Sequence, residues 1–256
     1  VYHLQIYLKD SCNTGWLPAV GPISFTTTCA PVVAPFVEDF NSGSQPGCWE
    51  AYSNTSSTNA LAFWKYSGSP VGGALGNGRP AGSYAWVDGS NPSGVDTLTN
   101  VTLRTPYLDV SQLNVPQLYF EVYSLNSTNV GDNVTFSINL WDGAQWNNGI
   151  FSYAGDDTDW KDFTLLFNNY TLSGPIQLEF VVDKTTSLNS SQNDFLLDSV
   201  VVKEADACPR PDHFSVSSVM GTSATFDVNA VNAGSYDIEW GPRGFQQGSG
   251  AGTSVN

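Results

Sequence analysis

The sequence predicts an all-β protein whose central part is an antiparallel two-sheet jelly-roll sandwich. Apolar and polar residues alternate with a period of two in short segments, and Gly, Pro, Asn and Asp separate these segments. This pattern is typical of strands joined by turns, and we find no convincing helix longer than two turns. Hydrophobic residues make up 41% of the chain and aromatic residues 13%, so the strands can enclose a substantial core.

Nine strands are expected in the central part, which is enough for two packed sheets. Their predicted ranges are Phe36–Phe40, Ala62–Tyr66, Tyr84–Val87, Val101–Leu108, Gln117–Leu125, Val134–Trp141, Trp160–Phe167, Ile176–Asp183 and Phe195–Lys203. The segment Ser67–Gly82 is too rich in Gly and Pro to be a strand. We expect it to form a long loop of the kind that carries ligands on β-sandwiches.

Three regions follow one another along the chain. Residues 31–206 form the predicted jelly-roll domain. Residues 1–30 contain two strands, Tyr2–Leu8 and Ile23–Thr28, that are typical of the end of another β-sandwich, and residues 207–256 are typical of the beginning of a further one. Because both flanking pieces are incomplete, we expect neighbouring repeats of the same protein or a complementary fragment to complete them.

The charge balance limits the classes of partner. Nine Lys and Arg residues against 24 Asp and Glu residues give a formal net charge of −15, which disfavours nucleic acids and anionic membranes. No apolar run approaches the ~20 residues of a membrane span, so we expect no membrane insertion. Cations or neutral sugars fit better. Only 13% of the residues are charged, and Asn, Ser, Thr and Gly are frequent in the loops, which is typical of secreted or cell-surface β-proteins. A glycan or a cell-surface protein is the expected partner.

The four cysteines indicate an oxidising compartment, and none of their spacings resembles a zinc site. If the strands beside Cys12 and Cys29 are antiparallel neighbours, these cysteines lie at opposite ends of them, beyond the roughly 7 Å limit of a disulfide. The local pair Cys29–Cys48 is therefore favoured, and Cys12 and Cys208 then pair outside this chain or with each other. Pairing of Cys12 with Cys29 and of Cys48 with Cys208 stays open.

Alternation along three strands assigns one side to the core and the other to a candidate ligand-binding surface. In Gln117–Leu125, Val134–Trp141 and Ile176–Asp183 every second residue is apolar. If these strands are neighbours, the other side offers flat rings that stack on sugar C–H surfaces and short polar groups that bond to hydroxyls. The expected ligand-binding residues are Tyr119, Glu121, Tyr123, Asn139, Trp141 and Glu179. An ordinary solvent face remains the alternative.

Catalysis has little support in the sequence, and we expect no enzyme activity. Both histidines, His3 and His213, lie outside the central domain, so no Ser-His or Cys-His arrangement forms within it. A carboxylate-pair glycosidase remains an alternative, because Glu121 and Glu179 occupy like faces of two long strands.

A series of short motifs spans residues 31–205. In order, they are Glu38-Asp39-Phe40, Gly47-Cys48-Trp49, Phe63-Trp64, Tyr84-Ala85-Trp86-Val87-Asp88, Leu103-Arg104-Thr105-Pro106-Tyr107-Leu108, Gln117-Leu118-Tyr119-Phe120-Glu121, Trp160 to Phe163, Glu179-Phe180 and Phe195-Leu196-Leu197-Asp198-Ser199-Val200. In this order and spacing the central block resembles the MAM domain of cell-surface receptors and the cleaved-adhesin jelly-roll modules of Bacteroidetes-type secreted proteins. The flanking pieces resemble partial fibronectin type III repeats.

The resemblance implies a non-catalytic extracellular adhesion or carbohydrate-binding module in a repetitive multidomain protein. One alternative is a structural spacer, in which the side of Tyr119 and Trp141 is covered or scattered. The other is an accessory region of a secreted glycoside hydrolase or peptidase.

The acidic residues of the resembling motifs suggest one structural calcium ion. Calcium takes roughly six to eight oxygen ligands, which distant loops often supply together. In the resembled families the first and last strands pair, which brings Glu38, Asp39 and Asp198 together. Asp88 and Asn91, in one turn, are expected to complete the calcium shell. The alternative is that the first two acids cap a strand and that Asp88 initiates a turn.

Overall fold

The structure is a computed structural model of the 256-residue chain. It describes residues 2–6, 20–25, 29–54, 63–70, 78–89, 98–126, 134–184, 193–206, 213–220, 223–229, 236–240, 246 and 251–255. Every regular element within these ranges is a β-strand, and the chain divides into two compact units, Val1–Pro31 and Val32–Asn256. No helix in the described part of the chain is long and apolar enough to cross a membrane.

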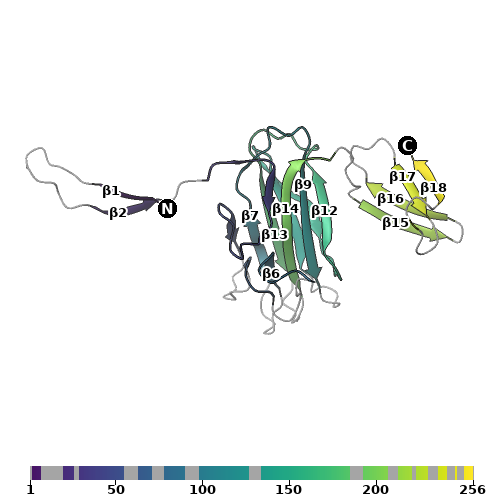
Figure 1. Cartoon of the computed structure of the whole chain (residues 1–256), viewed down its shortest axis with the longest axis horizontal. Helices are drawn as coiled ribbons and strands as arrows, with labels where there is room; N and C mark the ends of the chain where they lie inside the picture. Colours follow the sequence, from purple (N-terminus) through teal and green to yellow (C-terminus); the bar gives the residue numbers. More distant parts are fainter. Residues whose placement is uncertain are drawn as a thin grey trace, which may run out of the picture. The chain divides into compact units, whose positions relative to one another are not determined.

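In the described residues, two five-stranded antiparallel sheets form the central sandwich (Figure 1). The first, here the β13 sheet, has the order β11 (Trp146–Tyr153), β10 (Thr135–Trp141), β13 (Gln177–Lys184), β7 (Leu98–Arg104) and β5 (Glu50–Tyr52). The second, the β14 sheet, has the order β12 (Lys161–Leu166), β9 (Pro116–Leu125), β14 (Asp194–Glu204) and β4 (Phe36–Glu38), with β6 (Ala85–Asp88) also paired to β14. The predicted all-β antiparallel sandwich is confirmed.

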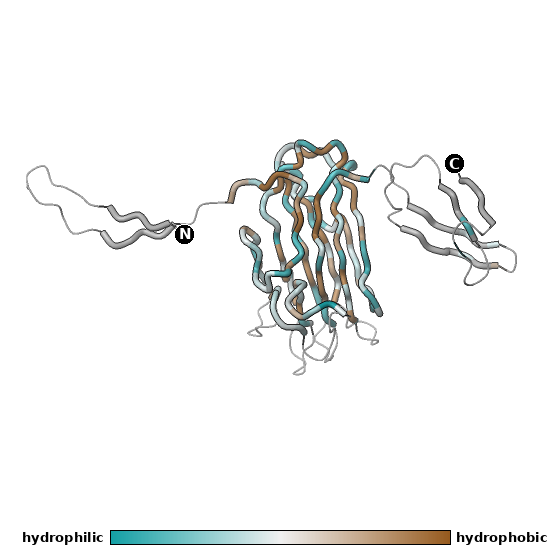
Figure 2. Tube along the Cα trace, in the orientation of Figure 1, coloured by the Kyte–Doolittle hydropathy of each residue, from teal (hydrophilic) through white to brown (hydrophobic). Residues whose placement is uncertain are grey.

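The core lies between the two sheets, and the inward residues of β9, β10 and β13 are fully buried, as the alternation predicts. They are Leu118, Phe120, Val122, Phe136, Ile138, Leu140, Leu178, Phe180 and Val182. Rings from both sheets meet there, and Phe136 of β10 stacks on Phe195 of β14 with ring centroids 4.3 Å apart. Figure 2 shows apolar residues recurring along the strands of the sandwich. Each buried side chain of this size contributes about 1.5–3 kcal/mol to stability.

Two further features of the central domain were expected from the sequence. β4 and β14 pair through Val37 and Val201, so the early and late strands of the domain are neighbours. Cys29 and Cys48 are disulfide-bonded, and the described residues contain one disulfide, so the favoured local pair is confirmed. Cys12 and Cys208 lie outside the described residues.

The sequence pattern misses two strands of the β13 sheet. β11 contains Asn147, Asn148 and Gly149 in place of an apolar alternation. It is an edge strand, and its register with β10 shifts between Ile138 and Leu140, so a bulge interrupts the periodicity. β5 is only three residues long and pairs with β7, and a strand this short carries no periodic signal.

Two predicted strands also differ from the structure. The range Val101–Leu108 is broken, because Pro106 lacks a backbone N–H and cannot continue the ladder. β7 therefore ends at Arg104, and the separate strand β8 (Leu108–Asp109) pairs in parallel with β3 (Val32–Val33), which departs from the antiparallel expectation. In the predicted strand Ala62–Tyr66, the structure describes one bridge, from Lys65 to Trp86.

The flanking pieces form antiparallel strand pairs. These are β1 (Tyr2–Ile6) with β2 (Val20–Phe25), β15 (His213–Met220) with β16 (Ser223–Asn229), and β17 (Tyr236–Trp240) with β18 (Ala251–Val255). The fibronectin type III assignment of these pieces and the domain boundaries at residues 30 and 206 stay predictions.

Candidate functional site

The six predicted ligand-binding residues divide between the two sheets. β10 and β13 are neighbours with Asn139 opposite Glu179, so these residues and Trp141 share the outer face of the β13 sheet. Those from β9 lie on the outer face of the β14 sheet: Tyr119, Glu121 and Tyr123. The premise that all three strands are neighbours is wrong, because alternation tells which residues avoid the core but not which sheet a strand joins.

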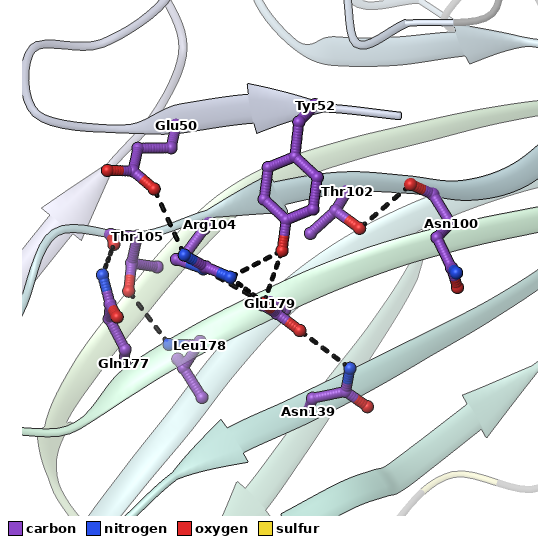
Figure 3. A network of polar contacts seen from close by, with 10 residues as sticks. All are labelled: Glu50, Tyr52, Asn100, Thr102, Arg104, Thr105, Asn139, Gln177, Leu178 and Glu179. Atoms are coloured by element: carbon purple, nitrogen blue, oxygen red, sulfur yellow. Dashed lines mark hydrogen bonds and ion pairs between the residues drawn. The ribbon is translucent and has the colours of Figure 1, made fainter. Parts of the chain in front are cut away.

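A row of polar side chains crosses the β13 sheet. The register pairs Glu50 of β5 with Arg104 of β7. It pairs Arg104 with Glu179 of β13, and Glu179 with Asn139 of β10. Residues that lie opposite each other in adjacent strands have their Cβ atoms about 5 Å apart, so each side chain in the row reaches the next. An acid, a base, an acid and an amide thus follow one another across the sheet (Figure 3).

Glu179 is the centre of the resulting network (Figure 3). Arg104 Nε and Nη2 donate to Glu179 Oε1 over 3.0 and 2.5 Å, and Tyr52 Oη donates to the same oxygen over 2.6 Å. Asn139 Nδ2 donates to Glu179 Oε2 over 2.9 Å. Arg104 Nη2 also donates to Tyr52 Oη over 2.6 Å, and Arg104 Nη1 lies 3.3 Å from Glu50 Oε2. Neighbouring strands therefore hold both oxygens of the buried carboxylate.

The network keeps Glu179 and Arg104 ionised. Burial opposes the charged carboxylate of Glu179, but hydrogen bonds from the amide, phenol and guanidinium groups outweigh it and hold its pKa below the usual range. Burial also opposes the charge on Arg104, but the bond to Glu179 and the nearby negative charges outweigh it and raise the pKa of the guanidinium. The two charges balance each other at neutral pH, and both side chains are fixed in place.

Three aromatic rings lie beside this network. Arg104 Cζ lies 5.0 Å from the ring centroid of Tyr52 and 5.3 Å from that of Trp146. Trp146 packs beside its register partner Trp141, with ring centroids 5.8 Å apart and planes at 56°. Both tryptophans are partly exposed. We call this surface the open face, and its residues are Glu50, Tyr52, Arg104, Asn139, Trp141, Trp146 and Glu179.

An arginine from the predicted glycine-rich loop lies over the outer face of the β14 sheet. The guanidinium of Arg79 forms ion pairs with Glu121 of β9 and Asp198 of β14. Its Cζ lies 3.8 Å from the ring centroid of Trp160, which in turn lies 5.9 Å from the fully buried ring of Tyr84. We call this surface the covered face, and its residues are Arg79, Tyr84, Trp86, Glu121, Trp160, Leu196 and Asp198.

The remaining two predicted binding residues of β9 adjoin the covered face. Tyr119 Oη donates to Glu121 Oε1 over 2.7 Å. Tyr123 packs beside Trp160 with ring centroids 6.0 Å apart. All three β9 side chains are partly buried. Arg79 from the loop pairs with Glu121 and lies over Trp160, so this side is less suited to a ligand than the open face.

Burial affects the two carboxylates beside Arg79 differently. Burial raises the pKa of Asp198 to about 6, although the Ser199 amide and Arg79 favour the charged form. Burial acts on Glu121 in the same direction, but hydrogen bonds from Tyr119 and Arg79 outweigh it and lower its pKa. The pKa values of the two carboxylates therefore shift in opposite directions, because hydrogen bonds outweigh burial at Glu121 but not at Asp198.

Sequence reasoning assigned no binding role to several residues of these faces, among them Tyr52, Arg79, Arg104 and Trp146. Arg79 lies in a loop, where no periodicity assigns a direction to a side chain. Tyr52 and Trp146 lie in the two strands that the pattern misses. Arg104 did leave a signal, because it alternates with the buried Leu103 and so points out of the core.

The predicted calcium ligands near the start and end of the domain have local partners. Glu38 Oε1 accepts a hydrogen bond from Phe40 N over 2.8 Å. Asp39 is exposed and accepts a hydrogen bond from a backbone amide two residues further on. Asp198 is paired with Arg79. β4 and β14 pair as expected. The charge of Asp198, however, is already balanced by the guanidinium of Arg79.

The other two predicted calcium ligands are Asp88, the last residue of β6, and Asn91. Asp88 is 2% exposed and lies opposite Asp194 in the β6–β14 register, whereas Asn91 lies outside the described residues. Among the residues that the structure describes, no three His, Cys, Asp or Glu side chains form a group that could hold a metal ion. Calcium binding stays a prediction.

The alternative of a carboxylate-pair glycosidase with Glu121 and Glu179 is wrong. Such hydrolysis requires two acids roughly 5–10 Å apart that flank one glycosidic bond. Glu121 lies on the covered face and Glu179 on the open face, with the core of the sandwich between them. Both carboxylates are also held in ion pairs. They cannot act on the same bond.

No protein-family model matches the chain, and no curated protein matches it. Among solved structures, the K3 cleaved adhesin domain of Lys-gingipain from Porphyromonas gingivalis is similar, with 14% identity, a TM-score of 0.47, and 66% of this chain and 98% of that chain covered. CBM27-1 of Caldicellulosiruptor saccharolyticus, solved with mannohexaose, has 16% identity, a TM-score of 0.38, and coverage of 68% and 99%. TmCBM61, solved with β-1,4-galactotriose, has 12% identity, a TM-score of 0.42, and coverage of 65% and 94%.

These similarities concern the β-sandwich, and one of them is with a cleaved-adhesin domain, which the sequence resembles. The MAM and fibronectin type III resemblances stay predictions. At such identities and TM-scores we infer no ligand from the similar structures. A proposal about function therefore rests on the geometry of the two faces.

Proposed function

We propose that the protein is a non-catalytic extracellular module that binds a neutral glycan through the open face. The observation that carries this proposal is a pair of partly exposed tryptophans, Trp141 and Trp146, beside a row of hydrogen-bonding groups that the sheet holds in place. Aromatic rings and fixed polar groups together supply the stacking and the hydroxyl recognition that sugars require.

Trp141 is the stacking residue in this proposal. Arg104 lies within 5.3 Å of the ring centroids of Tyr52 and Trp146, so the guanidinium is the neighbour of those two rings. Trp141 lies beside Trp146 and on the same outer face as Asn139 and Glu179. A sugar ring on Trp141 thus has its hydroxyls beside the polar row.

The polar row favours a neutral ligand. Glu179 and Arg104 balance each other, and the largely exposed carboxylate of Glu50 adds a negative charge, with 64% of its side chain accessible. A chain with a formal net charge of −15 also repels anionic glycans.

The polar row is also ordered before a ligand binds. Asn139 donates to Glu179 over 2.9 Å and accepts a hydrogen bond from the Gly149 amide over 2.8 Å, so its position is set in advance.

An extracellular setting is consistent with the disulfide of Cys29 and Cys48. In this setting the proposed partner is a glycan or a glycosylated cell-surface protein. Neighbouring repeats of the same protein are proposed to complete the flanking strand pairs.

A glycan array probed with the full chain tests the proposal. We expect retention on neutral oligosaccharides. Trp141→Ala should weaken that retention roughly 5- to 30-fold, because a stacked ring contributes about 1–2 kcal/mol. The melting temperature should change little, since Trp141 is partly exposed and lies outside the core.

The matched control is Tyr119→Ala, which removes a ring from the outer side of the other sheet. Glycan retention by this variant should equal that of the wild type. Equal losses in the two variants would contradict the assignment to the open face. A wild-type chain that no glycan retains would favour the spacer role.

A further inference from the structure

A second concave site lies at one end of the sandwich, where two loops enclose a pocket of about 660 Å³. The first loop, with the strand residues at its two ends, covers residues 109–116 from the end of β8 to the start of β9, and the second, residues 167–175, lies between β12 and β13. The proposed glycan-binding surface includes none of these residues. The pocket is therefore a separate site.

Hydrogen bonds fix the wall formed by the first loop. Asp109 Oδ1 accepts a bond from Ser111 N over 3.0 Å, which closes a turn at the start of the loop. At the far end, the carboxylate of Glu204 accepts bonds from the amides of Asn114 and Val115 over 2.7 and 3.1 Å. Both ends of this wall are therefore held in place.

The second wall is fixed by the turn between β10 and β11. Ser173 N donates to Asp142 O over 2.8 Å. Gly143, with φ +98°, approaches the loop so closely that a Cβ atom there would lie 2.4 Å from Gly174 N. Only glycine tolerates this conformation and this approach. The pocket is thus preformed, and a ligand pays little to order it.

The lining combines apolar surface with a single charge. Val110 and Phe167 are buried, and Leu113, Tyr170 and Leu172 are partly buried. Among the described residues that line the pocket, Asp109 is the one charged side chain. The hydrogen bonds from Ser111 hold the pKa of Asp109 below its usual range, so the carboxylate is ionised at neutral pH.

We propose that this pocket binds an arginine side chain from a peptide segment of a partner protein. The methylene stem of arginine covers apolar surface while its guanidinium reaches a carboxylate, here that of Asp109. The planar guanidinium can also lie on the ring of Tyr170. The net charge of −15 attracts a basic segment and repels an acidic one. A neutral glycan would leave the carboxylate without a counter-charge.

An NMR titration of the full ¹⁵N-labelled chain tests the proposal. The probe is a short alanine peptide with blocked ends and one arginine. We expect its addition to shift the amide signals of Asp109, Ser111 and Tyr170. The same peptide with citrulline, which has nearly the same shape but no charge, should bind about tenfold more weakly because the charge-assisted bond is lost.

Two variants locate the site. Asp109→Asn keeps an acceptor for Ser111 N and removes the charge, so arginine binding should weaken about tenfold. Asp162→Asn removes an exposed charge from β12, outside the pocket, and binding should be unchanged. Equal binding of the two peptides, an unaffected Asp109→Asn variant, shifts spread over the acidic surface, or no shifts at all would each overturn the proposal.

Discussion

The two outer faces of the sandwich each carry an arginine that lies beside an aromatic ring and pairs with two carboxylates. Arg104 belongs to β7 and stands in a cross-strand row, so its rings and polar groups remain partly exposed. Arg79 comes from a loop and fastens that loop across the β14 sheet through Glu121 and Asp198. The same interactions therefore present a surface on one side and cover a surface on the other, depending on whether a strand or a loop supplies the cation.

The buried acids of the two faces show why hydrogen-bond donors matter. Burial opposes the charge on both Glu179 and Asp198. Donors from three side chains outweigh burial at Glu179 and lower its pKa. At Asp198 the Ser199 amide and Arg79 do not outweigh it, and the pKa rises to about 6. The open face thus holds a carboxylate that is stably charged, whereas the covered face tolerates one that is readily protonated.

Removing the cation of the covered face should give the largest effect. Arg79→Ala leaves Glu121 and Asp198 as adjacent, partly buried acids without a counter-charge, and we expect a loss of about 2–3 kcal/mol at neutral pH. Urea unfolding followed by tryptophan fluorescence measures this loss. Glycan retention by the open face should be unchanged.

The combined variant Arg79→Ala with Asp198→Asn tests whether the unpaired carboxylates cause that loss of stability. It removes one of the two stranded charges, so part of the lost stability should return. A single Arg79→Ala variant with the urea midpoint of the wild type would show that the loop does not depend on these ion pairs.

Glu179→Gln should affect stability and ligand binding together. Glutamine keeps the size of the side chain but leaves Arg104 without its main anion, so we expect a loss of about 1–2 kcal/mol and roughly tenfold weaker glycan binding. Calorimetric titration and urea unfolding measure the two effects. The control Glu50→Gln removes the exposed partner of the same arginine and should cost less than about 0.5 kcal/mol. If Glu179→Gln bound the glycan with wild-type affinity, the network would not be needed to position the side chains of the open face for binding.

Acid should weaken the protein partly through Glu179. Its folded-state pKa lies below the ordinary value of 4.5, so its contribution to stability is present above pH 4.5 and is lost as the pH falls through the folded pKa. Urea midpoints should therefore fall less steeply with acid in Glu179→Gln than in the wild type. Parallel pH profiles of the two proteins would contradict the lowered pKa.

The proposed calcium ion should have the smallest effect, because Asp198 already has a counter-charge in Arg79. A chelator should lower the melting temperature slightly, calcium should restore it, and Asp198→Asn should not respond. An unchanged melting temperature of chelated wild-type protein at saturating calcium would remove Glu38, Asp39, Asp88, Asn91 and Asp198 as a site.

The local pattern of the sequence was enough to predict the strands and their inward sides. Phe120, Phe136 and Phe180 each occupy one of the apolar positions that recur at every second residue of their strands, and all three are fully buried as expected. The local pairing of Cys29 with Cys48 was predictable for a similar reason, since both cysteines lie close together in the chain. Strand alternation depends on residues within a few positions of one another, and the cysteine pair on a short separation along the chain, so the sequence reveals both directly.

Only the tertiary structure decided which strands became neighbours. Tyr119 and Trp141 have the same alternation signal, yet they lie on opposite sides of the sandwich because β9 and β10 join different sheets. The polar row around Arg104 and Glu179 likewise brings together four strands that are far apart in the chain. Such contacts depend on long-range strand order, which loop paths and core packing determine together, and periodicity within one strand carries no record of it.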